Sequence, residues 1–210
     1  LPMSLVERYA HGEAVMIGKL GALVSLLLLS SPAFANPVSG KVAEGYLFQP
    51  SGRMIQMSSK LSERQRRFIS VLIPLMEKQL NKPLQYYGSI AFSPDEGFQS
   101  DASQSALNYH STAAADRAAI AACNKNRKSG TRGCVLAARI LPKGFSSQPL
   151  TLSTNATAAF EQVYQRSARP KALAVSASTG AYGVGSSNDA MAVCRREAKG
   201  ANDCQILVAD

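Results

Sequence analysis

SIAFSPDEG, residues 89–97, and ALAVSASTG, residues 172–180, are two versions of the pattern that decides the fold. Each begins with a short apolar run and ends in a polar turn closed by glycine, which is typical of a strand that leads into a turn. An alanine-rich stretch ending in cysteine follows each version, and a second cysteine comes a short loop later. We therefore predict an internal duplication.

The first predicted repeat covers residues 86–145, and its apolar spacing indicates the order strand, strand, helix, strand. We expect its helix to be capped by Thr112 and to end near Cys123. The strands of this repeat are expected at residues 86–92, before Asn108, and at 134–141.

The second predicted repeat covers residues 171–210 and keeps the same order in a tighter form. We expect its helix to be capped by Ser187 or Asn188. Together, the repeats predict an α+β fold in which two ββαβ units share one sheet-and-helix core. The strands of the second unit are expected at residues 172–176, 181–185 and 204–209.

An N-terminal amphipathic helix is predicted in the lead-in, residues 36–85, which is otherwise extended with one strand. Ser62 and Gln65 form a capping-box pattern at its start, and the helix should end near Asn81. Pro74 predicts a kink or two short helices. The residues at helical spacing, expected to face the core, are Phe68, Ile69, Leu72, Leu75, Met76 and Leu80.

A bridging segment, residues 146–170, connects the repeats. We expect a strand at residues 150–152 and a bridging helix at residues 155–166. The side chains of this helix that should face inward are Ala159, Phe160 and Val163.

The beginning of the chain predicts a signal peptide at residues 16–35, after an upstream segment, residues 1–15, that we expect not to be translated. A basic start and an apolar run lead to a small-x-small cleavage pattern before Asn36, and Met3 is an alternative start. We expect the mature protein to be periplasmic or secreted, with no membrane span.

All four cysteines lie within residues 36–210, and an even number in an oxidising compartment favours disulfides. Four cysteines allow three pairings, and only one of them gives both repeats the same bond. The alternative, a four-cysteine zinc site, lacks a Cys-x-x-Cys spacing. The predicted disulfides join Cys123 to Cys134 and Cys194 to Cys204.

The segments YGSIA, residues 87–91, and STGAYG, residues 178–183, together with the cysteine spacing, resemble a family of small exported bacterial domains of unknown function. Its members read YGAIAYSPSTGAYG before an alanine-rich helix and two cysteines. The chain also resembles short alphaproteobacterial exported proteins with two such units, some of which carry an automatic aminolevulinate synthase label. The residues give that label no support, because the lysines fall in polar loops or charged helix ends, where a buried Schiff-base lysine would be needed. The resemblance implies fold and export, and no activity.

The formal net charge of +9 favours anionic partners, so we expect an anionic envelope polymer or an acidic protein, and no specific nucleic acid. The cations between the paired cysteines could form one face if the repeats are related by a twofold axis, extended by Arg64, Arg66 and Arg67. Alternatively, these cations stay solvated and only offset the dipole at the C-terminal end of a helix. The residues of this predicted anionic-ligand face are Lys125, Arg127, Lys128, Arg132, Arg195, Arg196 and Lys199.

No catalytic constellation is visible, so we expect a protein that is not an enzyme and holds no cofactor or metal. His110 is the sole histidine after the signal, and Asp95 and Glu96 sit in a turn where solvated acids are expected. The favoured function is a binding module for an anionic envelope component or acidic partner. A structural envelope protein, and an enzyme with a cleft between the repeats, are the alternatives.

Overall fold

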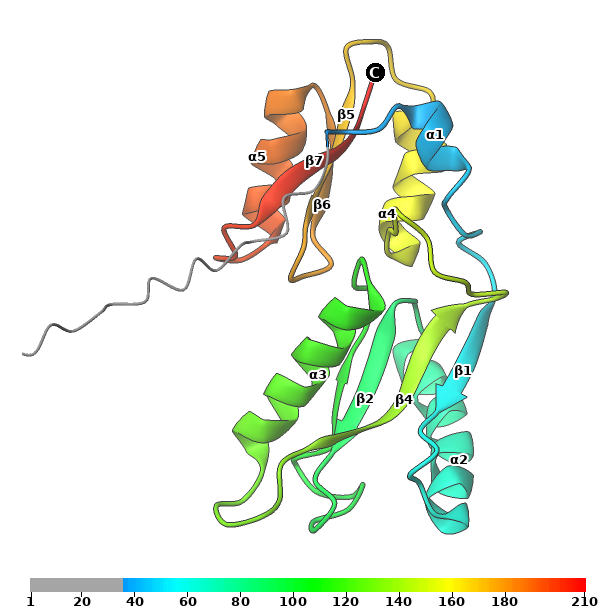
Figure 1. Ribbon diagram of the computed structural model, residues 1–210, viewed down its shortest axis with the longest axis vertical. Helices are drawn as coiled ribbons and strands as arrows, with labels where there is room; N and C mark the ends of the chain where they lie inside the picture. Colours follow the sequence, from blue (N-terminus) through cyan, green and yellow to red (C-terminus); the bar gives the residue numbers. More distant parts are fainter. Residues whose placement is uncertain (1–35) are drawn as a thin grey trace, which may run out of the picture. The chain divides into compact units, whose positions relative to one another are not determined.

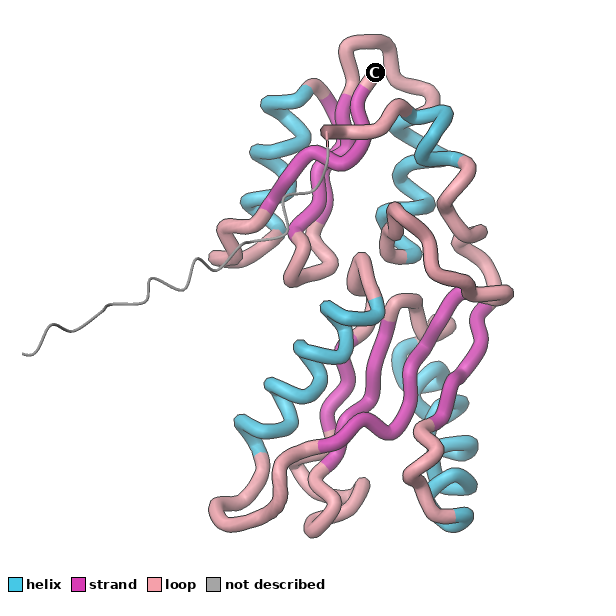
Figure 2. The backbone as a smooth tube through the Cα atoms, in the orientation of Figure 1, coloured by secondary structure: helices cyan, strands magenta, loops and turns pink. Residues whose placement is uncertain are grey.

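The computed structural model describes residues 36–210. The predicted upstream segment and signal peptide, residues 1–35, lie outside the described residues. The described part contains α-helices and β-strands arranged in two antiparallel sheets, which is the predicted α+β class (Figure 1). The expectation of one shared sheet-and-helix core is wrong, because the strands form two separate sheets (Figure 2).

The first sheet has the strand order β1-β4-β2-β3, with every neighbouring pair antiparallel. Helix α3 (Thr112–Asn126) covers one face of this sheet, and helix α2 (Glu63–Leu80) covers the other. The strands are β1 (Arg53–Met57), β2 (Gly88–Phe92), β3 (Gln104–Ala106) and β4 (Val135–Pro142).

The second sheet has the strand order β6-β5-β7 and is also antiparallel. Helix α5 (Ser187–Glu197) covers one face, and helix α4 (Thr154–Ala159), continued by the π-helix η1 (Phe160–Tyr164), packs against the other. The strands are β5 (Ala172–Ser176), β6 (Tyr182–Gly185) and β7 (Cys204–Ala209).

The two ββαβ units place corresponding strands in corresponding positions. The first strand of each unit is central, with the second strand of the unit on one side and the last strand on the other. The pairing of the central strand with the last strand shifts register between Ile90 and Ala91 in one unit and between Leu173 and Ala174 in the other. These pairs occupy equivalent positions in the two sequence patterns. The origin of this similarity in a duplication stays a prediction.

Small side chains line the contact between each sheet and the helix of its own unit. Ala91 and Ala119 pack together in the first unit, and Ala174 and Ala190 pack together in the second. Gly183 allows the closest approach, because a Cβ at this position would lie 2.1 Å from the carbonyl oxygen of Ala190. Each helix therefore lies close to its sheet.

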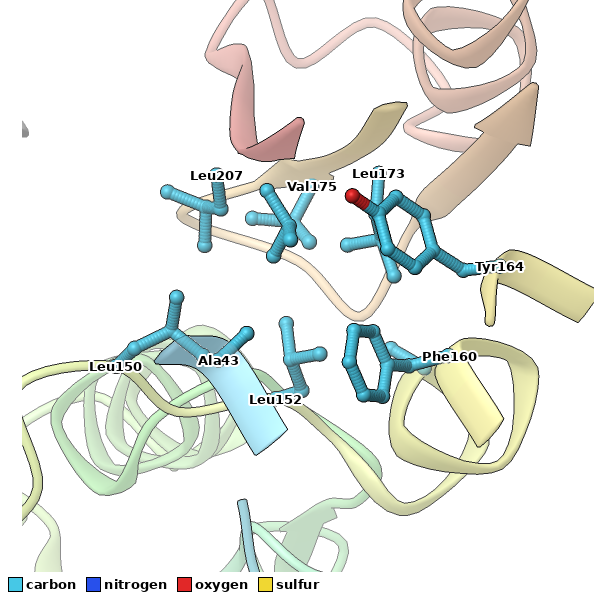
Figure 3. Close-up of a cluster of buried hydrophobic side chains, with 10 residues drawn as sticks. Ala43, Leu150, Leu152, Phe160, Tyr164, Leu173, Val175 and Leu207 are labelled. Atoms are coloured by element: carbon cyan, nitrogen blue, oxygen red, sulfur yellow. The ribbon is translucent and has the colours of Figure 1, made fainter. Parts of the chain in front are cut away.

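Large side chains fill the opposite faces. In the first unit Ile69 and Ile73 of α2 pack in one cluster with Ile90 and Phe92 of β2. The second unit has its own apolar cluster, in which Phe160 and Tyr164 approach the side chains of β5 (Figure 3). The residues labelled in Figure 3 are Ala43, Leu150, Leu152, Phe160, Tyr164, Leu173, Val175 and Leu207.

The lead-in contacts both sheets. Val38 pairs with Val208 of β7 in a parallel bridge, and helix α1 (Gly40–Glu44) places Ala43 in the core of the second sheet. The chain then continues to β1, which joins the first sheet. The predicted extended lead-in with one strand therefore contains a short helix as well.

The capping box of α2 is confirmed. The Ser62 hydroxyl accepts from the Gln65 amide at 3.3 Å, the Gln65 side chain accepts from the Ser62 amide at 2.8 Å, and Asn81 caps the other end. The prediction of two short helices is wrong, because α2 continues through Pro74. Pro74 is exposed, so water can solvate the carbonyl group that has no amide partner there.

Three local predictions of helix starts and strands are corrected. Ser111 caps α3 in place of Thr112, and Ser186 caps α5 in place of Ser187 or Asn188. Residues 150–152 form no strand, and they pack as irregular chain against the second sheet.

The inward face of the bridging helix also differs from the prediction. Phe160 is buried as expected, but Val163 is 50 % exposed and Tyr164 is buried in its place. The Gln165 amide donates to the Phe160 carbonyl in a π-helical bond of 2.9 Å. The wider turn rotates the following residues, which brings Tyr164 onto the inward side.

Candidate functional site

The structure joins Cys123 to Cys134 and Cys194 to Cys204, the two pairs that the sequence predicts. The Cα–Cα distances are 6.0 and 6.1 Å. Each bond ties the last part of a helix to the beginning of the final strand of its unit. The bonds therefore close the two loops that carry the predicted cationic face.

Two acidic side chains of a neighbouring turn, Asp95 and Glu96, bind the first of these loops. Asp95 accepts from the backbone amide of Arg132 at 2.7 Å and lies 2.6 Å from its guanidinium group. Hydrogen bonds from Arg132 hold the pKa of the Asp95 carboxyl below its usual range. The cation and the acid of this exposed pair therefore largely neutralise each other.

Glu96 and Arg127 also serve to shape this loop. The Glu96 carboxylate accepts from the amide of Lys128 at 3.1 Å and from the hydroxyl of Thr131 at 3.2 Å. The Arg127 guanidinium donates to the side chain of Asn124 at 3.1 Å and to the Thr131 carbonyl. The paired carboxylates that were candidates for acid–base chemistry thus have structural contacts in the described part of the chain.

The second loop also contacts the turn of its unit through an acidic side chain, but here the acid, Asp203, belongs to the loop. Asp203 accepts from the Ser176 hydroxyl at 2.5 Å and from the Ser178 amide at 2.7 Å. Burial raises the pKa of the Asp203 carboxyl, but these hydrogen bonds outweigh burial and hold the pKa below its usual range. Arg196 donates to Glu197 at 3.1 Å. The exposed cations in this region are Arg195, Arg196 and Lys199.

The two loops do not form one face. Residues 127–134 follow the C-terminal end of α3, whereas Lys199 lines a cavity together with Asn108, which lies just ahead of the N-terminal end of α3. Helix α3 contains 15 residues, a length of about 22 Å at the usual rise per residue. The predicted single cationic face is therefore corrected to two separate groups of cations.

His110 is a buried connection between segments that are far apart in the sequence. Its Nε2 lies 2.9 Å from the Ala181 carbonyl oxygen, and its Nδ1 accepts from the Ser153 amide at 3.2 Å. Because a carbonyl can only accept, Nε2 carries the proton. Burial lowers the pKa of His110 to about 4, against opposing effects of the Ala181 hydrogen bond and the charge of Asp203. The adjacent Ser111 hydroxyl caps α3 and accepts from the Ala114 amide.

A cavity of about 630 Å³ lies beside this connection. Gly180, part of its lining, packs so closely that a Cβ there would lie 2.2 Å from the Asn108 carbonyl oxygen. The Asn108 side chain accepts from the Asn155 amide at 3.1 Å. These polar groups connect the two units. The charged side chains that line the cavity are Glu197, which accepts from Arg196, and Lys199.

The outward surface of α2 carries a different arrangement, which we call the α2 stripe: Arg64, Arg67, Val71, Leu75 and Lys78. All five side chains are exposed. Val71 is 61 % exposed and Leu75 is 57 % exposed. The stripe therefore combines two exposed apolar side chains with cations toward both ends of the helix.

The helical spacing in the sequence predicts that Leu75 and Leu80 lie on the core side of α2, and this prediction is wrong. Leu75 and Leu80 are both exposed, and Ile73, which was not expected in the core, is buried beside Ile69. Arg66 lies off the stripe and is half-buried. The spacing of three and four residues from Arg64 to Lys78 was the signal that could have revealed the stripe.

No group of three or more histidine, cysteine, aspartate or glutamate residues is placed to hold a metal ion within residues 36–210. In the same part of the chain, no helix has the length and apolar character required to cross a membrane. No protein-family model matches the chain, and neither a curated protein nor a solved structure shows significant similarity to it.

Proposed function

We propose that the protein is an exported, disulfide-stabilised binding module that attaches to an anionic component of the cell envelope through the α2 stripe. Two disulfides are consistent with folding outside the reducing cytoplasm. The predicted signal peptide and the resemblance to exported bacterial domains point in the same direction. The proposal assigns no catalytic step to the protein.

The α2 stripe is the observation that carries this proposal. Arg64 and Lys78 form no ion pair with the other described residues, and neither do Lys125 and Lys128. Lys125 and Lys128, however, flank a loop in which Asp95 and Glu96 are already engaged. The stripe thus presents cations together with exposed apolar side chains.

The two acids of α2 lie beside the stripe and have their own partners. Glu63 is 3.4 Å from Arg67 in an exposed pair, and Glu77 is 2.5 Å from Arg53 on β1. An exposed pair of this kind contributes little and leaves Arg67 able to exchange Glu63 for an external anion. The outward surface of α2 is therefore suited to anionic targets.

Sedimentation with isolated envelope fragments tests the proposal. We expect binding at low salt that weakens as the salt concentration rises, because counterions screen exposed charges. The variant Arg64→Gln, Arg67→Gln, Lys78→Gln should bind at least about tenfold more weakly, since each cation near an anionic surface is worth about a factor of five. Glutamine keeps a high helix propensity, so α2 should stay folded.

A matched control removes three cations from the two loops: Lys125→Gln, Arg195→Gln and Arg196→Gln. This control changes the net charge by the same amount and should retain most of the binding. Equal losses in both variants would show that net charge alone determines binding. A loss only in the control would assign binding to the loops, and retention that is insensitive to salt would refute the proposal.

A further inference from the structure

We infer that the anionic component is a lipid bilayer surface, on which α2 lies flat and inserts Val71 and Leu75 between the headgroups. This inference rests on the proposed function and identifies its target. Helix α2 already buries Ile69 and Ile73 against the first sheet, so its fold accounts for one apolar side. Val71 and Leu75 form a second apolar site, which is exposed and belongs to none of the core clusters of the described residues.

The positions along the stripe match a helix that lies in the plane of a membrane. Successive residues of an α-helix are rotated by about 100°, which places the five side chains within a sector of about 80°. Val71 and Leu75 occupy the middle of the stripe, and the outermost cations, Arg64 and Lys78, are separated along the axis by about 21 Å. Long basic side chains at both ends can reach lipid phosphates while the apolar middle enters the interface.

The surroundings of the stripe favour shallow insertion. Pro74 is exposed on the same side of the helix, and its missing amide leaves the Ser70 carbonyl without an intrahelical partner. The hydrocarbon core would penalise such a carbonyl, whereas water and headgroups can satisfy it. Only two apolar side chains, Val71 and Leu75, would enter the interface, so the apolar area buried in the bilayer is small. The expected attachment is therefore weak, reversible and sensitive to salt.

The charge pattern argues against a second copy of the chain as the partner. Two copies that met through the stripe would bring Arg64, Arg67 and Lys78 of one copy near the same cations of the other. An acidic protein would need a preformed groove to receive a convex helix, whereas a fluid bilayer adapts to one. The acid that shares a small hollow with Arg64 is Glu96, and its carboxylate is bound by the loop at Lys128 and Thr131.

Vesicle sedimentation with the purified, oxidised protein tests the inference. We expect binding to vesicles of equal parts phosphatidylglycerol and phosphatidylcholine, and little binding to phosphatidylcholine alone. The variant Val71→Gln, Leu75→Gln should lower the affinity about tenfold through lost apolar burial. The matched control Val42→Gln, Val163→Gln alters two other exposed apolar residues, 45 % and 50 % exposed, and should bind as the wild type does.

A spectroscopic reporter separates insertion from charge-driven adsorption. The chain contains no tryptophan, so Leu75→Trp introduces a single indole into the stripe. Its emission should shift to shorter wavelength with anionic vesicles, and the emission of a Val163→Trp control should stay unchanged. This reading does not depend on loss of binding and remains informative if the glutamine variant folds poorly.

The outcomes distinguish this inference from the proposed function. Unchanged vesicle binding by Val71→Gln, Leu75→Gln, with no emission shift at position 75, would overturn insertion and leave the charge-driven module intact. Salt-sensitive binding to envelope fragments but not to anionic vesicles would identify a polymer or an acidic protein as the target and overturn the inference. Absence of binding to envelope fragments would overturn both.

Discussion

Acidification should destabilise the protein through His110. The imidazole is buried, and protonation of Nδ1 would remove the acceptor for the Ser153 amide and place a donor there instead. The pKa of His110 is lowered from 6.5 to about 4 in the folded protein, chiefly by burial. The unfolded chain therefore binds the proton more readily than the folded chain. The contribution of the neutral imidazole to the free energy of unfolding is fully present above pH 6.5 and is lost as the pH drops toward 4.

The expected loss follows from the size of this pKa difference. One pKa unit corresponds to about 1.4 kcal/mol, so full protonation of His110 lowers the free energy of unfolding by about 3 kcal/mol. The carboxyl groups of Asp95 and Asp203 have pKa values below 3.8, and their protonation acts mainly below this range. The decline between pH 6.5 and pH 4.5 should therefore report largely on the imidazole.

Urea unfolding at a series of pH values measures this loss, with His110→Gln as the comparison. The glutamine amide can donate to the Ala181 carbonyl but does not titrate, so the variant should show a much flatter profile. His110 is also the sole histidine in residues 36–210, which allows its imidazole to be titrated directly by proton NMR. Constant wild-type stability over this range, or an imidazole pKa of 6.5 or higher, would refute the reasoning.

Three further results are expected. Reduction with dithiothreitol should lower the free energy of unfolding by about 3 kcal/mol for each disulfide, as measured in urea. Gly183→Ala should cost about 1–3 kcal/mol, because its Cβ meets the Ala190 carbonyl oxygen at 2.1 Å; Gly133→Ala, with no contact closer than 4.0 Å, is the control. Thermal unfolding should show a cost of about 3–5 kcal/mol for Phe160→Ala and almost none for Val163→Asp; the reverse order would contradict the π-helical register.

The local elements of both units could be predicted because their signals are local. Strand β7 has the predicted bounds, the capping box of α2 forms as expected, and the paired cysteines follow from the comparison of the two sequence patterns. The predicted cap lies one residue too late for α3 and one or two residues too late for α5. There, serine precedes another residue able to cap, and the propensities of neighbouring positions are nearly equal.

Contacts between distant segments explain the larger differences. Val38 pairs with Val208, so the first and last parts of the described chain lie side by side, and no local sequence pattern predicts this pairing. Tyr164, and not Val163, faces inward because of a π-helical turn, and the period of a regular α-helix does not predict such a turn. The Tyr164 hydroxyl lies 3.1 Å from Asp210, so the burial of Tyr164 also depends on the C-terminal strand region.

The sequence predicts an anionic-ligand face on the loop cations, whereas our proposal places the anion-binding surface on the α2 stripe. The prediction of a loop face rests on the first loop, in which no acid interrupts the cations in the sequence. Asp95 lies far from Arg132 in sequence, and folding alone brings the two side chains together. The sequence does not reveal the α2 stripe, because Leu75 lies at helical spacing from the residues predicted to face the core and is therefore assigned to the core. Only the burial of Ile73 shows that the inward face lies elsewhere.

The acids in the two loops indicate why these loops are better explained as structure than as a ligand site. In the first unit Asp95 belongs to the turn and reaches Arg132 in the loop, whereas in the second unit Asp203 belongs to the loop and reaches Ser178 in the turn. Asp95 and Ser178 occupy equivalent positions in the two sequence patterns. Both units thus keep the contact between turn and loop, although the acid lies on opposite sides of it. A ligand site would require particular charges to stay in place. Among the described residues, Arg64 and Lys78 of the α2 stripe form no ion pair, and the proposed contact with an external anion requires cations of this kind.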